Sequence, residues 1–261
     1  MVHMRIVMIG SGNAASVLSR HISEMNHQIV QVYNRTESAG KALAGSLGSV
    51  FIDDPHQITD EADLYIVALS DNALFDLSSW LPPLKKLVVH TAGSVSKELL
   101  QPVALNYGVL YPLQSLNAAI KSTPSIPFLV DASSPENLAF LYDFAKSLSA
   151  DVEVASDEDR RAMHLAAVIV NNFTNHLYAV AEKFCEASHI NFRLLLPLIG
   201  ETVNRLEYLP AGRLQTGPAF RNDNSTIDRH LQMLAKHPEL AVLYGTLTES
   251  IRLFHHEQIK K

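Results

Sequence analysis

Cysteine is almost absent from this chain, and charged residues and long apolar runs are also sparse. The single cysteine, Cys185, excludes an internal disulfide and is typical of a reducing compartment. Charged residues make up 18% and the net charge is −6, which argues against general binding to nucleic acid or an anionic membrane. No apolar run is long enough to cross a bilayer, and no signal-peptide pattern precedes the first expected strand. We therefore expect a cytoplasmic protein, with Cys185 packed inside a helix and without chemistry.

Short apolar segments alternate with helical patterns over residues 1–155. Several of these segments are apolar throughout, which is typical of parallel strands covered on both faces. The expected strands are residues 4–9, 28–33, 49–52, 63–69, 87–90, 109–111, 127–131 and 151–154. Helical patterns lie between them, among them residues 38–47, a brief turn at 58–62, and 135–148. The alternation predicts βαβ units and a mostly parallel sheet.

Residues 156–261 have a different pattern, because β-branched segments give way to long helical ones. The expected helices are residues 159–187, 194–206, 225–236 and 238–257. A chain of 261 residues also exceeds the usual size of one domain. The sequence therefore predicts an α/β domain with a mostly parallel sheet at 1–155 and an all-helical domain at 156–261, with the boundary near Ala155.

A glycine turn separates the first strand from the first helix. Its sequence is Gly10-Ser11-Gly12-Asn13-Ala14-Ala15, and a second strand follows within about thirty residues, as in dinucleotide-binding units. Gly10 allows a tight turn, Gly12 lets the backbone approach a pyrophosphate, and Ala15 lets helix and strand pack closely. The helix N-terminus then binds the phosphates. We favour this interpretation over a purely structural turn, and we assign residues 10–14 to cofactor binding.

The end of the second expected strand indicates which dinucleotide binds. NAD-binding units carry an acidic residue there, whereas an arginine accommodates the extra phosphate of NADP. This chain has Asn34-Arg35-Thr36, without a carboxylate until Glu37. We therefore predict NADP rather than NAD. The alternative is that Arg35 is a solvated loop cation and that Thr36 only caps the next helix.

Polar segments interrupt the chain at the carboxyl ends of three further strands. They are residues 70–72, 91–94 and 112–115. Ligands of parallel sheets collect at this edge, so we interpret the segments as site loops. Ordinary strand-to-helix turns, which use the same residue types, are the alternative.

The longest expected helix carries polar side chains on an otherwise apolar surface. His164, Val168, Asn172 and His176 follow one another at steps of four and would lie along one face, with Asn171 beside them. An imidazole and amides facing a cleft could orient a carbonyl or imine and supply a proton. A partly buried histidine and interhelical asparagine hydrogen bonds are the alternative.

Taken together, these features resemble the 6-phosphogluconate dehydrogenase-like superfamily, which includes 3-hydroxyisobutyrate dehydrogenases and pyrroline-5-carboxylate reductases. The chain is most similar to a branch with a Rossmann-type domain and a C-terminal helical domain of unknown function. The motifs that carry the resemblance are the glycine turn, Tyr111-Pro112-Leu113-Gln114-Ser115, Asn171-Asn172, and residues 216–223 (Thr-Gly-Pro-Ala-Phe-Arg-Asn-Asp).

The resemblance implies NADP binding, with the nicotinamide under Leu69-Ser70, Thr91 to Ser94, and Gln114. It also implies a homodimer through the helical domain. Hydroxyacid dehydrogenases of the superfamily place a catalytic lysine four residues before an asparagine. Alignment on Asn172 puts Val168 at that position, and valine cannot transfer a proton. We therefore assign His164 this role, since an imidazole suits proton transfer near neutrality, with Asn171 and Asn172 beside it.

Arg221 lies in a polar segment before the helix expected at 225–236. It could bind a substrate carboxylate or phosphate, and Ser94 and Gln114 complete the expected substrate contacts. The alternative for this segment is a charged loop whose groups bind one another, with Asp223 or Asn224 capping the helix. We find no spacing of Cys, His or carboxylates that indicates a metal.

The sequence thus favours an NADP-dependent oxidoreductase that passes hydride between nicotinamide and a small carbonyl or imine. The missing lysine keeps open a non-catalytic, NADP-binding regulatory or interaction protein. An enzyme that combines a deazaflavin with NADP is a third possibility.

Overall fold

The computed structural model describes residues 3–259 of the chain. The chain divides into two compact units, Met1–Asn172 and Phe173–Lys261. The strands end at β8 (Val152–Val154), in line with the change of pattern near Ala155. The division between the units comes later, after α5 (Asp157–Ala167), so the assignment of residues 156–172 to the helical domain stays a prediction.

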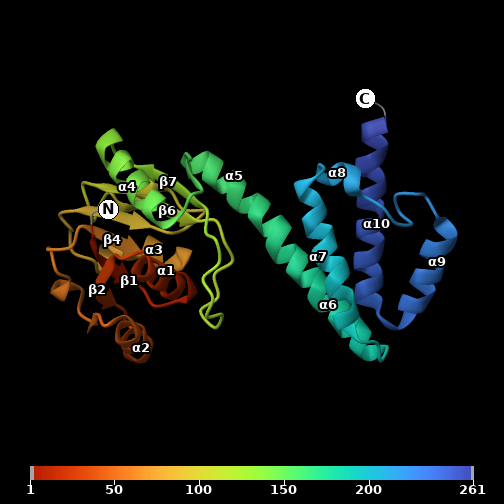
Figure 1. Cartoon of the computed structure of the whole chain (residues 1–261), viewed down its shortest axis with the longest axis horizontal. Helices are drawn as coiled ribbons and strands as arrows, with labels where there is room; N and C mark the ends of the chain where they lie inside the picture. The colour runs from red at the N-terminus through yellow and green to blue at the C-terminus, as the bar shows by residue number, and fades with distance from the viewer. Residues whose placement is uncertain (1–2, 260–261) are drawn as a thin grey trace. The chain divides into compact units, whose positions relative to one another are not determined.

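An eight-stranded sheet forms the centre of the first unit (Figure 1). Its order is β3-β2-β1-β4-β5-β6-β7-β8, and neighbours are parallel except β6 and β7. The other strands are β1 (Arg5–Ile9), β2 (Gln28–Tyr33), β3 (Val50–Ile52), β4 (Leu64–Val67), β5 (Leu87–His90), β6 (Tyr107–Pro112) and β7 (Phe128–Ala132). Every residue of β4 and β5 is buried, as expected of apolar parallel strands. The predicted mostly parallel sheet is confirmed.

Helices cover both faces of this sheet. One face packs against α1 (Asn13–Glu24), α2 (Glu37–Leu47) and α4 (Pro135–Leu148). The other packs against α3 (Asp71–Phe75) and the 3₁₀ helices η2 (Leu77–Ser79) and η3 (Lys97–Leu100). The helical turn expected at residues 58–62 is wrong, because the 3₁₀ helix η1 forms at Pro55–Gln57 instead. Asp54 caps that turn by accepting the His56 amide, and Pro55 suits its first position.

The long helix expected at 159–187 is present but is not α-helical throughout. It consists of α5, a π-helical segment η4 (Val168–Phe173) and α6 (Thr174–Ala187). Val168, Ile169 and Val170 are β-branched, and such a run is crowded in an α-helix. Because π hydrogen bonds join residue i to i+5, a step of four no longer returns to the same face. The single face expected to run from His164 to His176 is therefore not maintained.

The second unit continues with helices alone. They are η5 (Phe192–Leu195), α7 (Leu196–Asn204), η6 (Arg205–Glu207), α8 (Ala211–Leu214), α9 (Asn224–Met233), η7 (Leu234–Lys236) and α10 (Pro238–Ile259). The predicted all-helical character is confirmed, and Cys185 is buried and unpaired. Of the helices that the structure describes, none combines the length and hydropathy needed to cross a bilayer.

Candidate active site

The glycine turn closes tightly on the sheet between β1 and α1. Gly10 has φ +117°, and a Cβ at this position would lie 2.4 Å from the Ala68 carbonyl oxygen. Its amide donates to the Tyr33 carbonyl at 2.8 Å. Gly12, by contrast, has no heavy atom within 4 Å of where its Cβ would be. The turn thus requires glycine at position 10, whereas Gly12 leaves open space at the N-terminal end of α1.

This open space faces the uncapped N-terminus of α1. Gly12 occupies the N-cap position, no side chain caps the helix, and its first turn holds no acidic residue. The first amides of a helix lack carbonyl partners within it, so those of Asn13 and Ala14 remain donors for an anion. The geometry fits a diphosphate.

The Asn13 side chain binds a distant loop of the first unit. Its Oδ1 accepts a hydrogen bond from the Ala118 amide at 3.1 Å. Arg20, also on α1, donates to the Ile120 carbonyl at 3.0 Å. The segment between β6 and β7 is therefore held against α1, and the backbone amide of Asn13 stays available to a phosphate. Contacts of Ser11 and Ala14 with the cofactor stay predictions.

Arg35 is an exposed cation just after β2. Among the residues that the structure describes, it forms no ion pair or side-chain hydrogen bond. The nearest acidic residue in sequence, Glu37, is neutralised by Lys41 at 2.5 Å, and this hydrogen bond lowers the pKa of Glu37. Thr36 occupies the N-cap of α2, but its side chain makes no capping bond. Asn34 donates to the Thr36 carbonyl at 2.9 Å, which fixes the turn. The positive charge thus remains available to a phosphate.

The loops after β4, β5 and β6 lie at one edge of the sheet, because these strands are adjacent and parallel. Leu69 is half-buried, Ser70 is exposed, and Thr91 is buried. Ser94 donates its hydroxyl to the Asp71 carboxylate, which joins the first two loops. Gln114 follows β6 and donates its amide to the Ser125 carbonyl at 2.9 Å. Its side chain therefore holds its own loop closed, which leaves less of it for a substrate than predicted.

Two buried polar side chains, His90 and Arg160, hold the loop after β5 in place. His90 accepts from the Ala92 amide at 3.2 Å, and its second nitrogen lies 3.3 Å from the Ser96 carbonyl. Burial, with the nearby Arg160 charge, lowers the pKa of His90 to about 4, so the ring is neutral at pH 7. Arg160 of α5 is 1% exposed and donates to the Val95 carbonyl. The loop is thus held at both ends.

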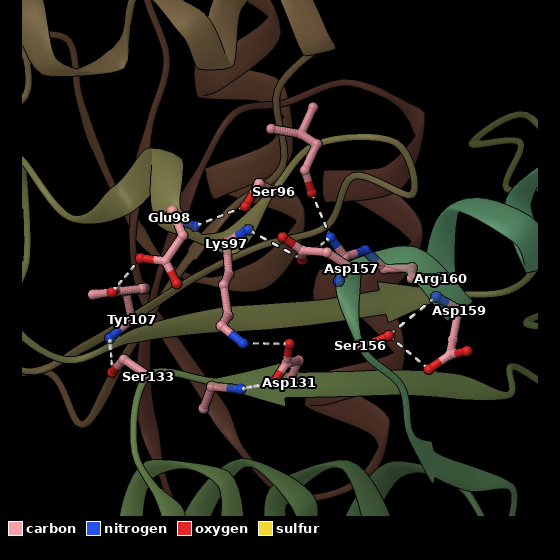
Figure 2. A network of polar contacts seen from close by, with 12 residues as sticks. Ser96, Lys97, Glu98, Tyr107, Asp131, Ser133, Ser156, Asp157, Asp159 and Arg160 are labelled. Carbon is pink, nitrogen blue, oxygen red and sulfur yellow. Dashed lines mark hydrogen bonds and ion pairs between the residues drawn. The ribbon is translucent and has the colours of Figure 1, made fainter.

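The same network continues along the start of α5 (Figure 2). Asp157 accepts from Arg160 at 2.7 Å and from the Lys97 amide at 3.3 Å. The Lys97 side chain forms an ion pair with Asp131 of β7 at 2.6 Å. Arg160 and the hydrogen bonds to Asp157 outweigh burial and lower the pKa of the Asp157 carboxyl. Helix α5 is therefore fixed in register against the loop that follows β5.

His164 lies one turn beyond Arg160 and touches the same loop. A Cβ on Gly93 would lie 2.7 Å from His164 Nδ1, so only glycine fits beneath the imidazole. The Tyr111 hydroxyl lies 3.0 Å from the same nitrogen, and the two rings meet edge to face. Burial raises the pKa of Tyr111, although Arg160 opposes this in part. His164 is thus positioned between the ends of β5 and β6.

A hollow of about 510 Å³ opens beside this histidine. We call it the substrate hollow. Apart from His164, its lining is neutral; it consists of Tyr111, Leu113, Gln114, Ser115, Met163, His164, Ala166, Ala167, Val168, Val170, Asn171 and Asn172. The π segment supplies Asn171 and Asn172, and π segments often mark functional sites. The structure thus brings together the three predicted catalytic residues.

Arg221 belongs to the second unit and is exposed, so its contact with a substrate stays a prediction. The neighbouring Asp223 caps α9 by accepting from the Thr226 amide at 3.1 Å, as expected. Hydrogen bonds from Thr226 and Ser225 lower its pKa. Asp223 thus caps the helix, as in the structural alternative given for this segment.

No role was predicted from the sequence for the side chains of Tyr111, His90 and Arg160. Tyr111 lies near the end of β6, and this position could have indicated that its side chain belongs to the site. His90 ends its strand in the same way. Arg160 lies four residues before His164 on an α-helix, so a shared face was predictable. Its burial was not, because arginine is mostly exposed.

Comparison with protein families gives two matches. Residues 5–93 match the family described as "NADP oxidoreductase coenzyme F420-dependent". Residues 126–251 match "Domain of unknown function (DUF2520)". No curated protein matches the chain.

Several solved structures are similar over nearly the whole chain. The provisionally assigned NADP oxidoreductase BF3122 from Bacteroides fragilis is 39% identical, covers 96% of this chain and 98% of its own, and has a TM-score of 0.89. A 1-pyrroline-5-carboxylate reductase from Streptococcus pyogenes is 16% identical, with coverages of 96% and 98% and a TM-score of 0.66. A reductive aminase from Aspergillus terreus, in complex with NADPH and ethyl levulinate, is 16% identical, with coverages of 96% and 94% and a TM-score of 0.66. The last two share the fold.

Proposed function

Because the chain belongs to the family of two-domain NADP oxidoreductases that includes the Bacteroides fragilis protein, we propose that it reduces a small carbonyl or imine compound. Family membership makes it an NADP-dependent oxidoreductase, as the sequence predicted. The observation that carries the finer proposal is the position of His164 at the substrate hollow, against the loop after β5.

The first unit supplies the groups that would hold the cofactor. The amides at the start of α1 would bind the diphosphate, with Gly12 leaving room for it. Arg35 would pair with the 2′-phosphate that distinguishes NADP from NAD. The loops containing Leu69, Ser70 and Thr91 would surround the nicotinamide. When bound, NADPH supplies a hydride.

His164 would supply the proton that completes the reduction. When a C=N or C=O carbon accepts a hydride, the π electron pair moves to the nitrogen or oxygen, which must then be protonated. The protonated imidazole of His164 would give up one ring proton and become neutral. Asn171 and Asn172 would orient the polar end of the substrate by hydrogen bonding. The neutral lining of the substrate hollow favours a substrate without a formal charge.

The name of each remote relative supports this class of substrate without defining it. A pyrroline-5-carboxylate reductase acts on a cyclic imine, and reductive aminases have the same fold as this chain. Arg221 would contribute only if the substrate carries an anionic group. Substrate binding by Ser94 and Gln114 is supported by their positions at the edge of the sheet.

A homodimer through the helical unit is part of the proposal. Several large apolar side chains of this unit are more than half exposed, among them Leu194, Leu198, Met233, Val242 and Leu253. Exposed apolar side chains in this number support an interaction face on this unit. Light scattering after gel filtration would test this: a monomeric mass would contradict the dimer. The reducing compartment also stays a proposal, supported by the unpaired Cys185.

The test is turnover of NADPH with uncharged cyclic imines and ketones, in wild type and H164Q. We expect the wild type to oxidise NADPH with at least one of these compounds. H164Q should bind NADPH as the wild type does but lose turnover by a factor of about 100 or more. H56Q removes an exposed histidine of η1 and serves as the control. Unchanged turnover in H164Q would contradict the role of His164, and tight NADPH binding without turnover of any compound would favour a regulatory protein.

A further inference from the structure

Tyr111 has one hydrogen-bond partner for its side chain among the residues that the structure describes. Its hydroxyl lies 3.0 Å from His164 Nδ1, and the ring centroids lie 6.0 Å apart at an interplanar angle of 76°. Tyr111 is 8% exposed, and burial raises the pKa of its hydroxyl, which therefore keeps its proton at neutral pH. A protonated hydroxyl can donate to a ring nitrogen that lacks a proton or accept from one that carries it, and His164 Nδ1 is its partner here.

The His164 ring is confined from a second side by Gly93. There the space that a Cβ would take is already filled by His164 Nδ1, at 2.7 Å, and by Cγ, at 2.8 Å. Gly93 and Tyr111 thus hold the Nδ1 edge of the ring from two different loops. The other ring nitrogen, Nε2, has no partner among the described residues, and His164 lines the substrate hollow.

We propose that Tyr111 is a positioning residue whose hydroxyl donates to His164 Nδ1 and thereby places the proton of the neutral imidazole on Nε2. When the ring becomes protonated, the same oxygen accepts from Nδ1–H, because a hydroxyl can donate or accept. The ring then keeps one orientation in both charge states, with Nε2–H free for a substrate. The effect of Tyr111 on catalysis rests on the proposed function. The position of the proton on the His164 ring does not, because it can be measured without turnover.

The direct test is long-range ¹H–¹⁵N correlation of the histidine rings in the NADPH-free protein, above pH 7. The His164 signals are identified by their loss in H164Q. We expect wild type to show the Nε2–H form alone, and Y111F to show the two nitrogen shifts drawn together as both forms become populated. Y107F is the matched control, because Tyr107 lies on the same strand and donates to Glu98. A proton on Nδ1 in wild type, or unchanged shifts in Y111F, would overturn the inference.

Kinetics then separate this inference from the proposed function. Y111F should lower kcat about tenfold or more with an active substrate, without a change in NADPH affinity. Y107F should leave both unchanged. If H164Q retains turnover, the proton role of His164 fails whatever the ring signals show. If H164Q loses turnover but Y111F matches wild type in kcat and in its ring signals, only the role of Tyr111 fails.

Discussion

Substitution by alanine should lower the stability of the protein at Gly10 and its affinity for NADPH at Gly12. In G10A, the new Cβ would lie 2.4 Å from the Ala68 carbonyl oxygen, and residue 10 has φ +117°. The Ala68 carbonyl follows β4 directly and cannot move away without shifting that strand. Backbone strain and overpacking each cost about 1–3 kcal/mol, so we expect the free energy of unfolding to fall by about 2–6 kcal/mol. In G12A the Cβ meets no atom within 4 Å, and the loss should stay below about 1 kcal/mol.

The assay combines urea unfolding with calorimetric titration of NADPH. Trp80 is the only tryptophan of the chain, and it stacks on Tyr33 with ring centroids 5.1 Å apart. Its fluorescence therefore reports on the unit that holds the turn. G12A should unfold as the wild type does but bind NADPH about tenfold or more weakly, since its Cβ occupies the space left for the diphosphate. A G12A protein with wild-type affinity, or a G10A protein with wild-type stability, would refute this reasoning.

Three further predictions concern cofactor choice, acid stability and the loop over α1. R35Q should weaken NADPH binding about 10- to 100-fold, because charge-assisted hydrogen bonds are worth about 1.5–3 kcal/mol, and should leave NADH binding unchanged. Fluorescence titration with NADPH and with NADH measures this. An equal change in affinity for the two coenzymes would show that Arg35 does not bind the 2′-phosphate. The pKa of His90 falls from 6.5 to about 4 on folding, so the unfolded state takes up the proton first. Above pH 6.5 His90 is neutral in both states and does not lower the free energy of unfolding. As the pH falls to 4, protonation of His90 in the unfolded state lowers that free energy by about 3 kcal/mol in total. Urea unfolding should show this decline relative to H90Q, and parallel pH profiles would contradict it. Lys121 is exposed in the segment that Asn13 holds against α1. NADPH should slow tryptic cleavage there, as seen by gel electrophoresis, and cleavage unaffected by saturating NADPH would show that this segment does not respond to the cofactor.

Much of the fold was predictable because local patterns and tertiary packing agree in the first unit. Residues 28–33, 87–90 and 135–148 form the expected elements with the expected bounds. Each is an apolar segment or a capped helix whose surroundings reinforce its own preference. The π segment was not predictable, because it depends on how a β-branched run relaxes within a longer helix.

The candidate site was predictable to the level of loops and of His164, but not to the level of its partners. The carboxyl-edge rule placed the loops, since it depends only on strand order. The Tyr111–His164 contact joins residues 53 apart in sequence, and no local pattern records it. The contacts of Asn13 and Gln114 were not predictable either, because their exposed side chains bind backbone groups of the β6–β7 loop.

Transfer of label from NADPH deuterated at the reactive C4 position tests the central claim most directly. The wild type, incubated with uncharged cyclic imines and ketones, should give a product heavier by one deuterium at the former C=N or C=O carbon, and H164Q should give far less. The account would be contradicted if the wild type binds NADPH tightly and transfers no deuterium to any of these compounds, or if H164Q transfers it as fast as the wild type does.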